Sequence, residues 1–292
     1  MDSKQNPFSL YDFLGYFTPG AIFLYISAAV SNRFFKFEFH KSLSERGFTD
    51  LETYVGLVLL AYVIGHALSF LSSAIVEKFS IWTHGYPSKY LTGTLSPGYL
   101  QTIGINGESL PIPCHAKLIR IIVWIIMFPV AMQDLVVGRG LSARSIYVKS
   151  LDRGTTEIIR MKIIALLKDK YGMGTLPKHL KPQNNDFFRL SYHYVLTKSL
   201  NHITSLKNYV ALYGFTRTMT FLSIILFWST LAFLIFNESK SNILNGMLML
   251  SVPFSFIYYM AFNKFVRRFT LEVLMALVVT YDDTSQKLNT EV

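Results

Sequence analysis

Histidine and cysteine most often carry metal or nucleophilic chemistry, and this chain of 292 residues has seven histidines and one cysteine. The sequence contains no HExxH motif, no pair of histidines four residues apart and no Cys/His cluster. Cys114 has no second cysteine with which to form a disulfide or a thiolate metal site. GINGES (104–109) lacks the lysine of a P-loop, and no GxSxG or kinase signature occurs. We therefore expect no metal, no cofactor and no catalytic residues, and a protein that is not an enzyme.

His66 is the histidine whose surroundings favour a functional role. It lies within Thr53–Val76, twenty-four residues without a charged side chain, which is long enough for a membrane-spanning helix. An ionisable group at that depth predicts a proton-sensing or ion-pathway residue. The alternative is a neutral imidazole that is hydrogen-bonded to a neighbouring helix, and the sequence does not decide between the two.

Small side chains recur every fourth residue along the same segment, at Ala61, Gly65, Ser69 and Ser73. This spacing places them on one face of a helix, where a second helix can approach closely. The sequence therefore predicts a packing interface on this face, and we expect the protein to form homo-oligomers through it.

Three further segments are apolar and long enough to span a membrane: Phe13–Asn32, Thr218–Asn237 and Ile243–Asn263. The last two are joined by a five-residue turn, which predicts an antiparallel hairpin. Pro19 and Gly20 lie near the start of the first segment and predict a kink there. The kink is either a hinge or a feature of an ordinary anchor.

Ile121–Gln133 is uncharged but short, and Pro129 interrupts it. This length favours a re-entrant or interfacial helix within residues 118–137 over a full span. A fifth span, with the N-terminus outside, is the alternative. The preceding loop is rich in glycine and proline and predicts short strands and turns.

The net charge of +10 is concentrated in one segment. Residues 139–217 contain fourteen Lys/Arg and four Asp/Glu, and the charges of the remaining chain cancel. Because basic loops tend to stay in the cytoplasm, we expect 77–217 to form a basic, α-rich cytosolic domain. We expect 264–292 to be a cytosolic tail with an amphipathic helix. The predicted fold class is mainly α, a polytopic membrane protein with four transmembrane helices (five as the alternative) and residues 1–76 as its first helix pair.

Basic residues follow the predicted spans closely and suggest contact with lipid headgroups. Arg217, at the entry to the third span, is expected to reach a lipid phosphate from an apolar stem. Lys264, Arg267 and Arg268 follow the fourth span and predict that its end is cytoplasmic. The partners expected for the basic segment are an anionic bilayer first, and also a cytosolic protein or a phosphorylated ligand; nucleic acid is not expected.

Several stretches resemble those of uncharacterised multi-span bacterial inner-membrane proteins, some of which are associated with phage-defence loci. The stretches are PFSLYDFLGYFTPGAIFLY, YVIGHALSFLSS with GYPSKYL, YVKSLD and YGFTRTMTF. This resemblance implies a place in the inner membrane and a role as a membrane-disrupting effector, and it transfers no catalytic residue. Our leading hypothesis is an oligomeric, channel-like effector that alters membrane permeability in response to a cytosolic signal. The alternative is a non-conducting scaffold that anchors or regulates a cytosolic partner.

Reporter fusions after Asn106 and after Arg153 test the number of spans. With four spans both reporters lie in the cytoplasm, so an alkaline phosphatase fusion at either site is inactive and a green fluorescent protein fusion is bright. Reporters on opposite sides would establish the five-span alternative.

Overall fold

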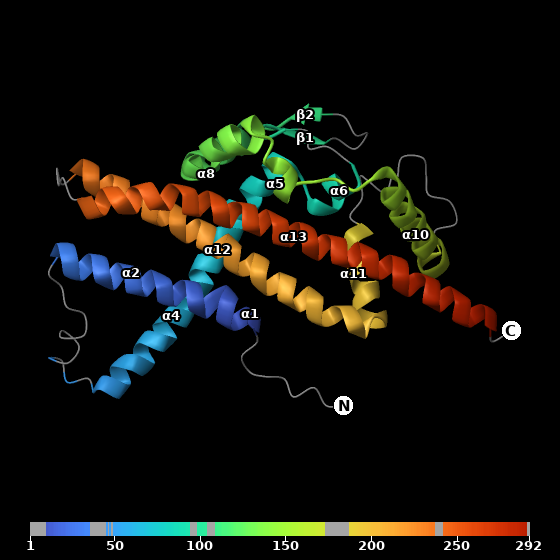
Figure 1. Ribbon diagram of the computed structural model, residues 1–292, viewed down its shortest axis with the longest axis horizontal. Coiled ribbons are helices and arrows are strands. Elements are labelled where there is room, and N and C mark those ends of the chain that lie inside the picture. The colour runs from blue at the N-terminus through green and yellow to red at the C-terminus, as the bar shows by residue number, and fades with distance from the viewer. Residues whose placement is uncertain are drawn as a thin grey trace. The chain divides into compact units, whose positions relative to one another are not determined.

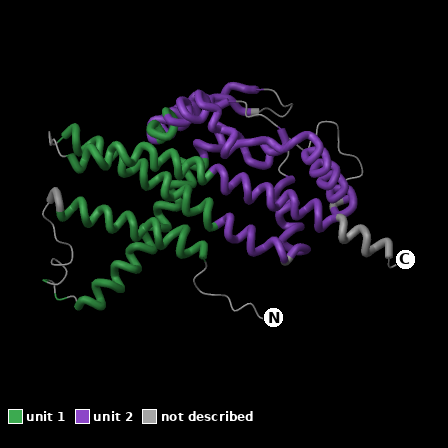
Figure 2. Tube along the Cα trace, viewed as in Figure 1, with its two compact units in different colours: residues 1–77, 127–132, 211–262 green, residues 78–126, 133–210, 263–292 purple. Residues whose placement is uncertain are grey.

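The computed structural model describes residues 10–35, 45, 47, 49–93, 98–103, 109–172, 187–236 and 242–290, which are mainly helical (Figure 1). The chain divides into two compact units (Figure 2). Unit 1 contains residues 1–77, 127–132 and 211–262, and unit 2 contains residues 78–126, 133–210 and 263–292. Two long helices, α12 (Leu200–Phe236) and α13 (Asn242–Thr290), contribute residues to both units.

Unit 1 is built from helices that are rich in apolar residues. Its first stretch contains α1 (Leu10–Asp12), the π-helical turn η1 (Phe13–Phe17) and α2 (Thr18–Phe35). Its second stretch contains α4 (Asp50–Ser72) and the π-turn η2 (Ser73–Glu77). Parts of α12 and α13 complete the unit. Among the described residues, four stretches are long and apolar enough to cross a membrane: Leu10–Asn32, Asp50–Leu91, Asn201–Phe236 and Asn242–Tyr281. The prediction of four such helices is confirmed, and three of them extend well beyond their predicted ends. The turn predicted between the last two lies mostly outside the described residues.

A capping box fixes the start of α4. The Thr49 hydroxyl accepts a hydrogen bond from the Glu52 backbone N–H at 3.3 Å, and the Glu52 carboxylate accepts one from the Thr49 N–H at 2.9 Å. Two backbone donors that a helix start leaves unpaired are thereby satisfied. Asp50 and Glu52 also place negative charge in the first turn, where the helix dipole favours it.

The first helical stretch and α4 meet through their glycines. A Cβ atom built on Gly20 would overlap the backbone of Ala61, and one built on Gly65 would overlap the backbone of Tyr16. Only glycine permits this separation of the two helices, so dispersion contacts between backbones hold them together. The π-turn η1 ends just before Pro19, and α2 continues through Pro19 and Gly20 without a break.

Unit 2 has a hydrophobic core of its own. Its walls are α10 (Arg153–Tyr171), α11 (Phe187–Lys198), the first residues of α12 and the last third of α13, with α6 (Pro87–Leu91) packed beside them. The largest fully buried side chains of this core include Leu91, Ile159, Leu166, Leu167, Leu206, Leu274 and Leu277. The predicted tail therefore packs on the predicted cytosolic segment and forms one core with it.

α10 has clear start and stop signals. The Asp152 carboxylate accepts from the Thr155 N–H at 2.8 Å, and Gly172 ends the helix with φ +64°, a left-handed conformation that glycine adopts without strain. Hydrogen bonds from the Thr155 side chain and backbone lower the pKa of Asp152.

The remaining elements of unit 2 include short helices, a π-turn and a two-stranded sheet, and the π-turn begins at a buried carboxylate. α5 (Lys78–His84) precedes α6, and β1 (Gln101–Ile103) pairs antiparallel with β2 (Ser109–Pro111). Asp134, 2% exposed, begins the π-turn η3 (Asp134–Gly140) and accepts hydrogen bonds from Arg144 and from the Tyr147 hydroxyl. Burial, and then the bond with Asp134, raise the pKa of Tyr147. Gly138 leaves room for the carboxylate, since a Cβ there would overlap it.

The segment predicted to be re-entrant or interfacial forms two helices, α7 (Cys114–Ile126) and α8 (Phe128–Gln133). The bend between Cys114–Ile126 and Phe128–Gly140 is 80°, so this pair is a broken span or a re-entrant loop. The bend is compatible both with the predicted re-entrant helix and with the alternative of a fifth span. One apolar surface of α7 is exposed, with five large side chains at Leu118, Ile119, Ile121, Ile122 and Ile125.

The glycine contact predicts a strong asymmetry between two substitutions in α4. Gly65→Ala forces a methyl group against the Tyr16 backbone and should cost about 1–3 kcal/mol, as other overpacked sites do. Gly56→Ala is the matched control, because nothing lies within 4 Å of its Cβ and alanine favours a helix by up to about 1 kcal/mol. Unfolding in mixed detergent micelles measures both, and equal stabilities would show that η1 and α4 do not pack as described.

Candidate functional site

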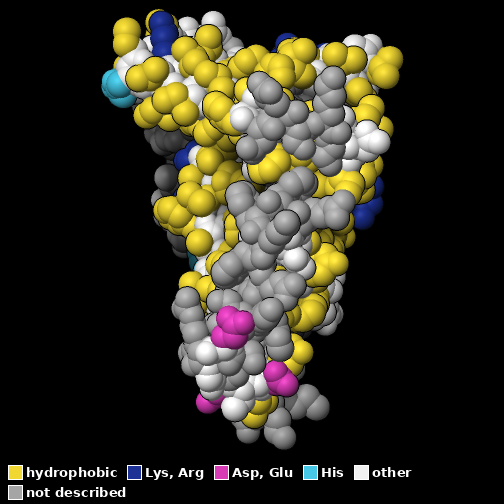
Figure 3. Space-filling model, turned by 90° about the vertical axis from the view of Figure 1, so that its left-hand side faces the viewer, with side chains coloured by type: hydrophobic (Ala, Val, Ile, Leu, Met, Phe, Trp, Pro, Cys, Tyr) yellow, Lys and Arg dark blue, Asp and Glu magenta, His cyan; other side chains and the backbone are white. Residues whose placement is uncertain are grey.

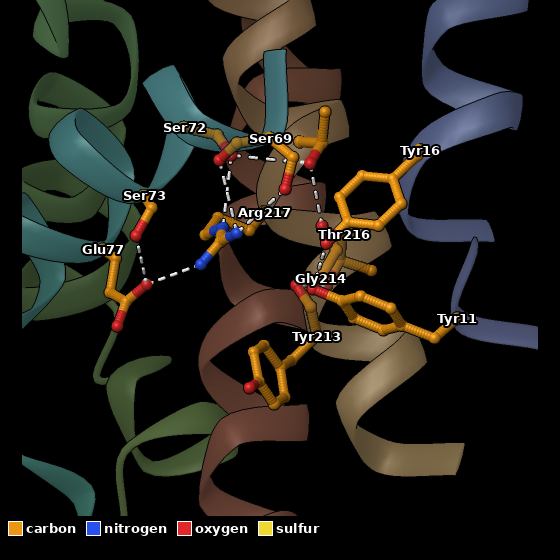
Figure 4. Close-up of polar contacts among 11 residues, drawn as sticks. Tyr11, Tyr16, Ser69, Ser72, Ser73, Glu77, Tyr213, Gly214, Thr216 and Arg217 are labelled. Carbon is orange, nitrogen blue, oxygen red and sulfur yellow. Dashed lines mark hydrogen bonds and ion pairs between the residues drawn. The ribbon is translucent and has the colours of Figure 1, made fainter. Parts of the chain in front are cut away.

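Arg217 of α12 is buried, with 8% of its surface exposed, among the apolar helices of unit 1 (Figure 4). Its Nη1 donates to the Glu77 carboxylate at 2.6 Å, and its Nε donates to the Ser72 hydroxyl at 3.2 Å. Its Nη2 donates to the Ser69 hydroxyl at 3.2 Å and to the Ser69 carbonyl at 3.3 Å. All three guanidinium nitrogens therefore have acceptors on α4 and η2.

Glu77 is the counter-ion and is less buried than the arginine. Its side chain is 39% exposed, against 9% for that of Arg217. The Ser73 hydroxyl donates to the same carboxylate oxygen at 3.1 Å. Ser73 and Glu77 are the ends of the π-turn η2, whose wider spacing changes the direction in which the carboxylate points.

Hydroxyl side chains line the buried face of α12 on both sides of Arg217. Thr216, Thr218, Thr220 and Ser223 are each less than 9% exposed. Each donates to the carbonyl four residues earlier, at 2.8 to 3.0 Å. The Thr218 hydroxyl also lies 3.4 Å from that of Ser72, which connects this row to the arginine cluster. The row satisfies its polar groups internally, as an apolar environment requires.

His66 lies beside the first helix and not in the arginine cluster. Its ring stacks on Tyr16 with centroids 3.8 Å apart and meets Tyr62 edge to face at 4.6 Å. Its side chain is exposed. The Tyr16 hydroxyl donates to that of Tyr11 at 3.2 Å, and the Tyr11 ring lies against Gly214 of α12.

Two expectations from the sequence are corrected by this geometry. Arg217 does not extend to a lipid phosphate, because a carboxylate and two serines of the same chain satisfy it within the helices. The small-residue face of α4 is occupied inside one chain: Ala61 and Gly65 contact the first helix, and Ser69 contacts Arg217. The packing interface predicted on this face is therefore present, but its partners lie in the same chain and not in a second copy.

The other basic residues singled out in the sequence follow the apolar part of α13. Lys264 and Arg268 are exposed, and Arg267 donates to the Lys149 carbonyl at 2.9 Å within unit 2. Pro19 and Gly20 are both buried, and Gly20 lies against the Ala61 backbone of α4.

Among the described residues, no group of three or more His, Cys, Asp and Glu side chains is placed to hold a metal ion. No family model, curated protein or solved structure matches the chain. The arginine cluster must therefore be interpreted from its own chemistry.

The pairing of Glu77 with Arg217 was not predicted, since 140 residues separate them. A signal was nevertheless present, because Glu77 continues the four-residue spacing of Ala61, Gly65, Ser69 and Ser73. An arginine cannot lose its charge in a protein, so the cluster can hold two helices together or release them, but it cannot act as an acid or a base.

A double-mutant cycle tests whether the pair links the two helices. Glu77→Gln and Arg217→Gln should each lower the free energy of unfolding. The loss in the double variant should be smaller than the sum of the two single losses, by a coupling energy of about 1–2 kcal/mol. Because 39% of the Glu77 side chain is exposed to solvent, the coupling energy should be smaller than that of a fully buried pair. Lys264→Gln, which removes an exposed charge, is the control and should change stability by less than about 0.5 kcal/mol. Strict additivity of the two changes would contradict the link.

Proposed function

We propose that this protein is a membrane-embedded effector in which the Arg217–Glu77 pair is a latch between two spanning helices. Breaking the latch in response to a cytosolic signal alters the permeability of the bilayer. The observation that carries the proposal is a buried, permanently charged side chain between apolar helices, whose counter-ion is half exposed. Ionisable groups at such positions are costly and mark functional sites.

The exposure of apolar side chains supports the membrane part of the proposal. Hydrophobic side chains predominate among the described residues on the face drawn in Figure 3. On α4 alone, Tyr54, Val55, Val58, Leu59 and Val63 are more than half exposed. A soluble monomer rarely exposes so many large apolar side chains on one helix, whereas lipid covers them at no cost.

The length of α12 supports a route for the signal. This helix is continuous from Leu200 to Phe236, and it contains both Leu206, in the core of unit 2, and Arg217. A ligand or protein that rearranges unit 2 therefore acts on the same helix that holds the latch. Repacked helix contacts of this kind are a common form of switching. The basic segment 139–217 and the cations at Lys264, Arg267 and Arg268 favour a cytoplasmic position for unit 2 and the C-terminus, in a bacterial inner membrane.

A non-conducting scaffold is the second candidate. It is favoured by the hydrophobic core of unit 2, whose residues all belong to that unit and which could support a docking surface for a soluble partner. In that case the latch only stiffens the membrane part, and its loss leaves the bilayer sealed.

Leak from proteoliposomes separates the two candidates. The purified chain is reconstituted in phosphatidylethanolamine and phosphatidylglycerol vesicles that contain potassium, and the membrane potential is followed with a dye. Glu77→Gln should raise the potassium leak at least about fivefold over the wild type, because it removes the attraction that holds α12 to α4. Arg268→Gln, which removes an exposed arginine, is the matched control and should leak as the wild type does.

A charge exchange sharpens the test. The double variant Glu77→Arg with Arg217→Glu keeps one ion pair between the helices and should leak less than Glu77→Gln. If Glu77→Gln, Arg217→Gln and the wild type all hold the potential equally, the effector proposal fails and the scaffold candidate remains.

A further inference from the structure

A pocket in unit 2 lies over the core, between α6, α10 and α11. It is an open pocket, with about 630 Å³ of empty space when the solvent in its mouth is included. Its apolar side includes Ile159, Ile163, Phe187 and Leu274, all buried core residues. The polar side chains that line it are Ser88, Lys89, Thr92, Thr156, Glu157 and Arg160.

The charged groups of the pocket are not engaged by the protein. Neither Arg160 nor Glu157 makes an ion pair or a side-chain hydrogen bond with any residue that the structure describes, and the Lys89 ammonium only lies over the Tyr86 ring at 5.9 Å. Arg160 and Lys89 are both half-buried, so each loses part of its hydration without gaining a counter-ion. Two incompletely compensated cations beside an apolar wall form a site for an anionic group that also carries an apolar part.

We propose that this pocket binds a nucleotide. Arg160 and Lys89 bind its phosphate, since a planar guanidinium and an ammonium are the usual phosphate ligands. The Phe187 ring and the aliphatic residues beside it cover one face of the base, and Glu157 accepts hydrogen bonds from sugar hydroxyls or from an amino group. The inference rests on the proposed function and deepens it, because it gives the class of the cytosolic signal.

Glu157 distinguishes a nucleotide from a simple anion or a lipid headgroup. A carboxylate repels phosphate, so a site built for inorganic phosphate or for phosphatidylglycerol is weakened by it. A nucleotide has hydroxyl and amino donors that need an acceptor, and the three hydroxyl residues of the pocket supply further partners. The combination of cations, one acceptor and an aromatic ring therefore matches a nucleotide better than either alternative.

The experiment measures binding of AMP, GMP and UMP to the full chain in detergent micelles by equilibrium dialysis, with adenosine and inorganic phosphate as partial ligands. At least one nucleotide should bind more tightly than either adenosine or phosphate. Arg160→Gln should weaken its binding at least tenfold and Lys89→Gln at least threefold. Lys168→Gln removes an exposed cation from the same helix, outside the pocket, and should bind as the wild type does. Circular dichroism of each variant checks that it is folded.

Glu157→Gln gives the decisive comparison, because it should weaken nucleotide binding while leaving phosphate binding equal or stronger. The proposal is overturned if no nucleotide binds at millimolar concentration, if Arg160→Gln binds as the wild type does, or if phosphatidylglycerol vesicles displace the nucleotide. Binding in micelles does not depend on any leak, so nucleotide binding without altered permeability would refute the effector function and leave this site established.

Discussion

A guanidinium buried between apolar helices constrains unit 1 more than any other group. It cannot be neutralised by losing a proton, so the chain must supply a carboxylate and enough acceptors at the same depth. Glu77 supplies the charge, and Ser69 and Ser72 supply the remaining acceptors. These three residues fix the rotation of α4 about its axis relative to α12. The same rotation turns Ala61 and Gly65 toward the first helix, where the backbones can meet.

Each π-turn that the structure describes contains a residue with a polar side-chain contact. Tyr16 of η1 donates a hydrogen bond to Tyr11, and Ser73 of η2 donates one to Glu77 at the other end of that turn. Asp134, the first residue of η3, accepts one from Tyr147. Each π-turn adds a residue to one helical turn and so moves the following side chains around the axis. The cost of the poorer hydrogen-bond geometry is offset where a charged or phenolic side chain thereby reaches its partner. This relation explains why the π-turns lie at the polar contacts and not in the purely apolar stretches.

The sequence predicted the apolar helices well because their signal is local. Length and hydropathy found all four of these helices. The sequence could not predict the ion pair between Arg217 and Glu77, since that contact depends on tertiary packing. The predicted fourth span ended at Asn263, because the cluster of cations that follows is typical of the end of a span. The helix continues to Thr290 because no glycine or proline follows, and because its last apolar residues have a core to enter.

The use of the small-residue face inside one chain limits how the helices of unit 1 can move. Had that face joined two copies, its helices could have separated by dissociation of protomers. Since Tyr16, Gly20 and Arg217 already occupy it, any change at this face must move elements of the same chain against one another. The element able to do so is α12, which packs on the unit 2 core through Leu206 and holds Arg217 further along the same helix. A rearrangement of that core would therefore be opposed by the Arg217–Glu77 ion pair before it could separate α12 from α4.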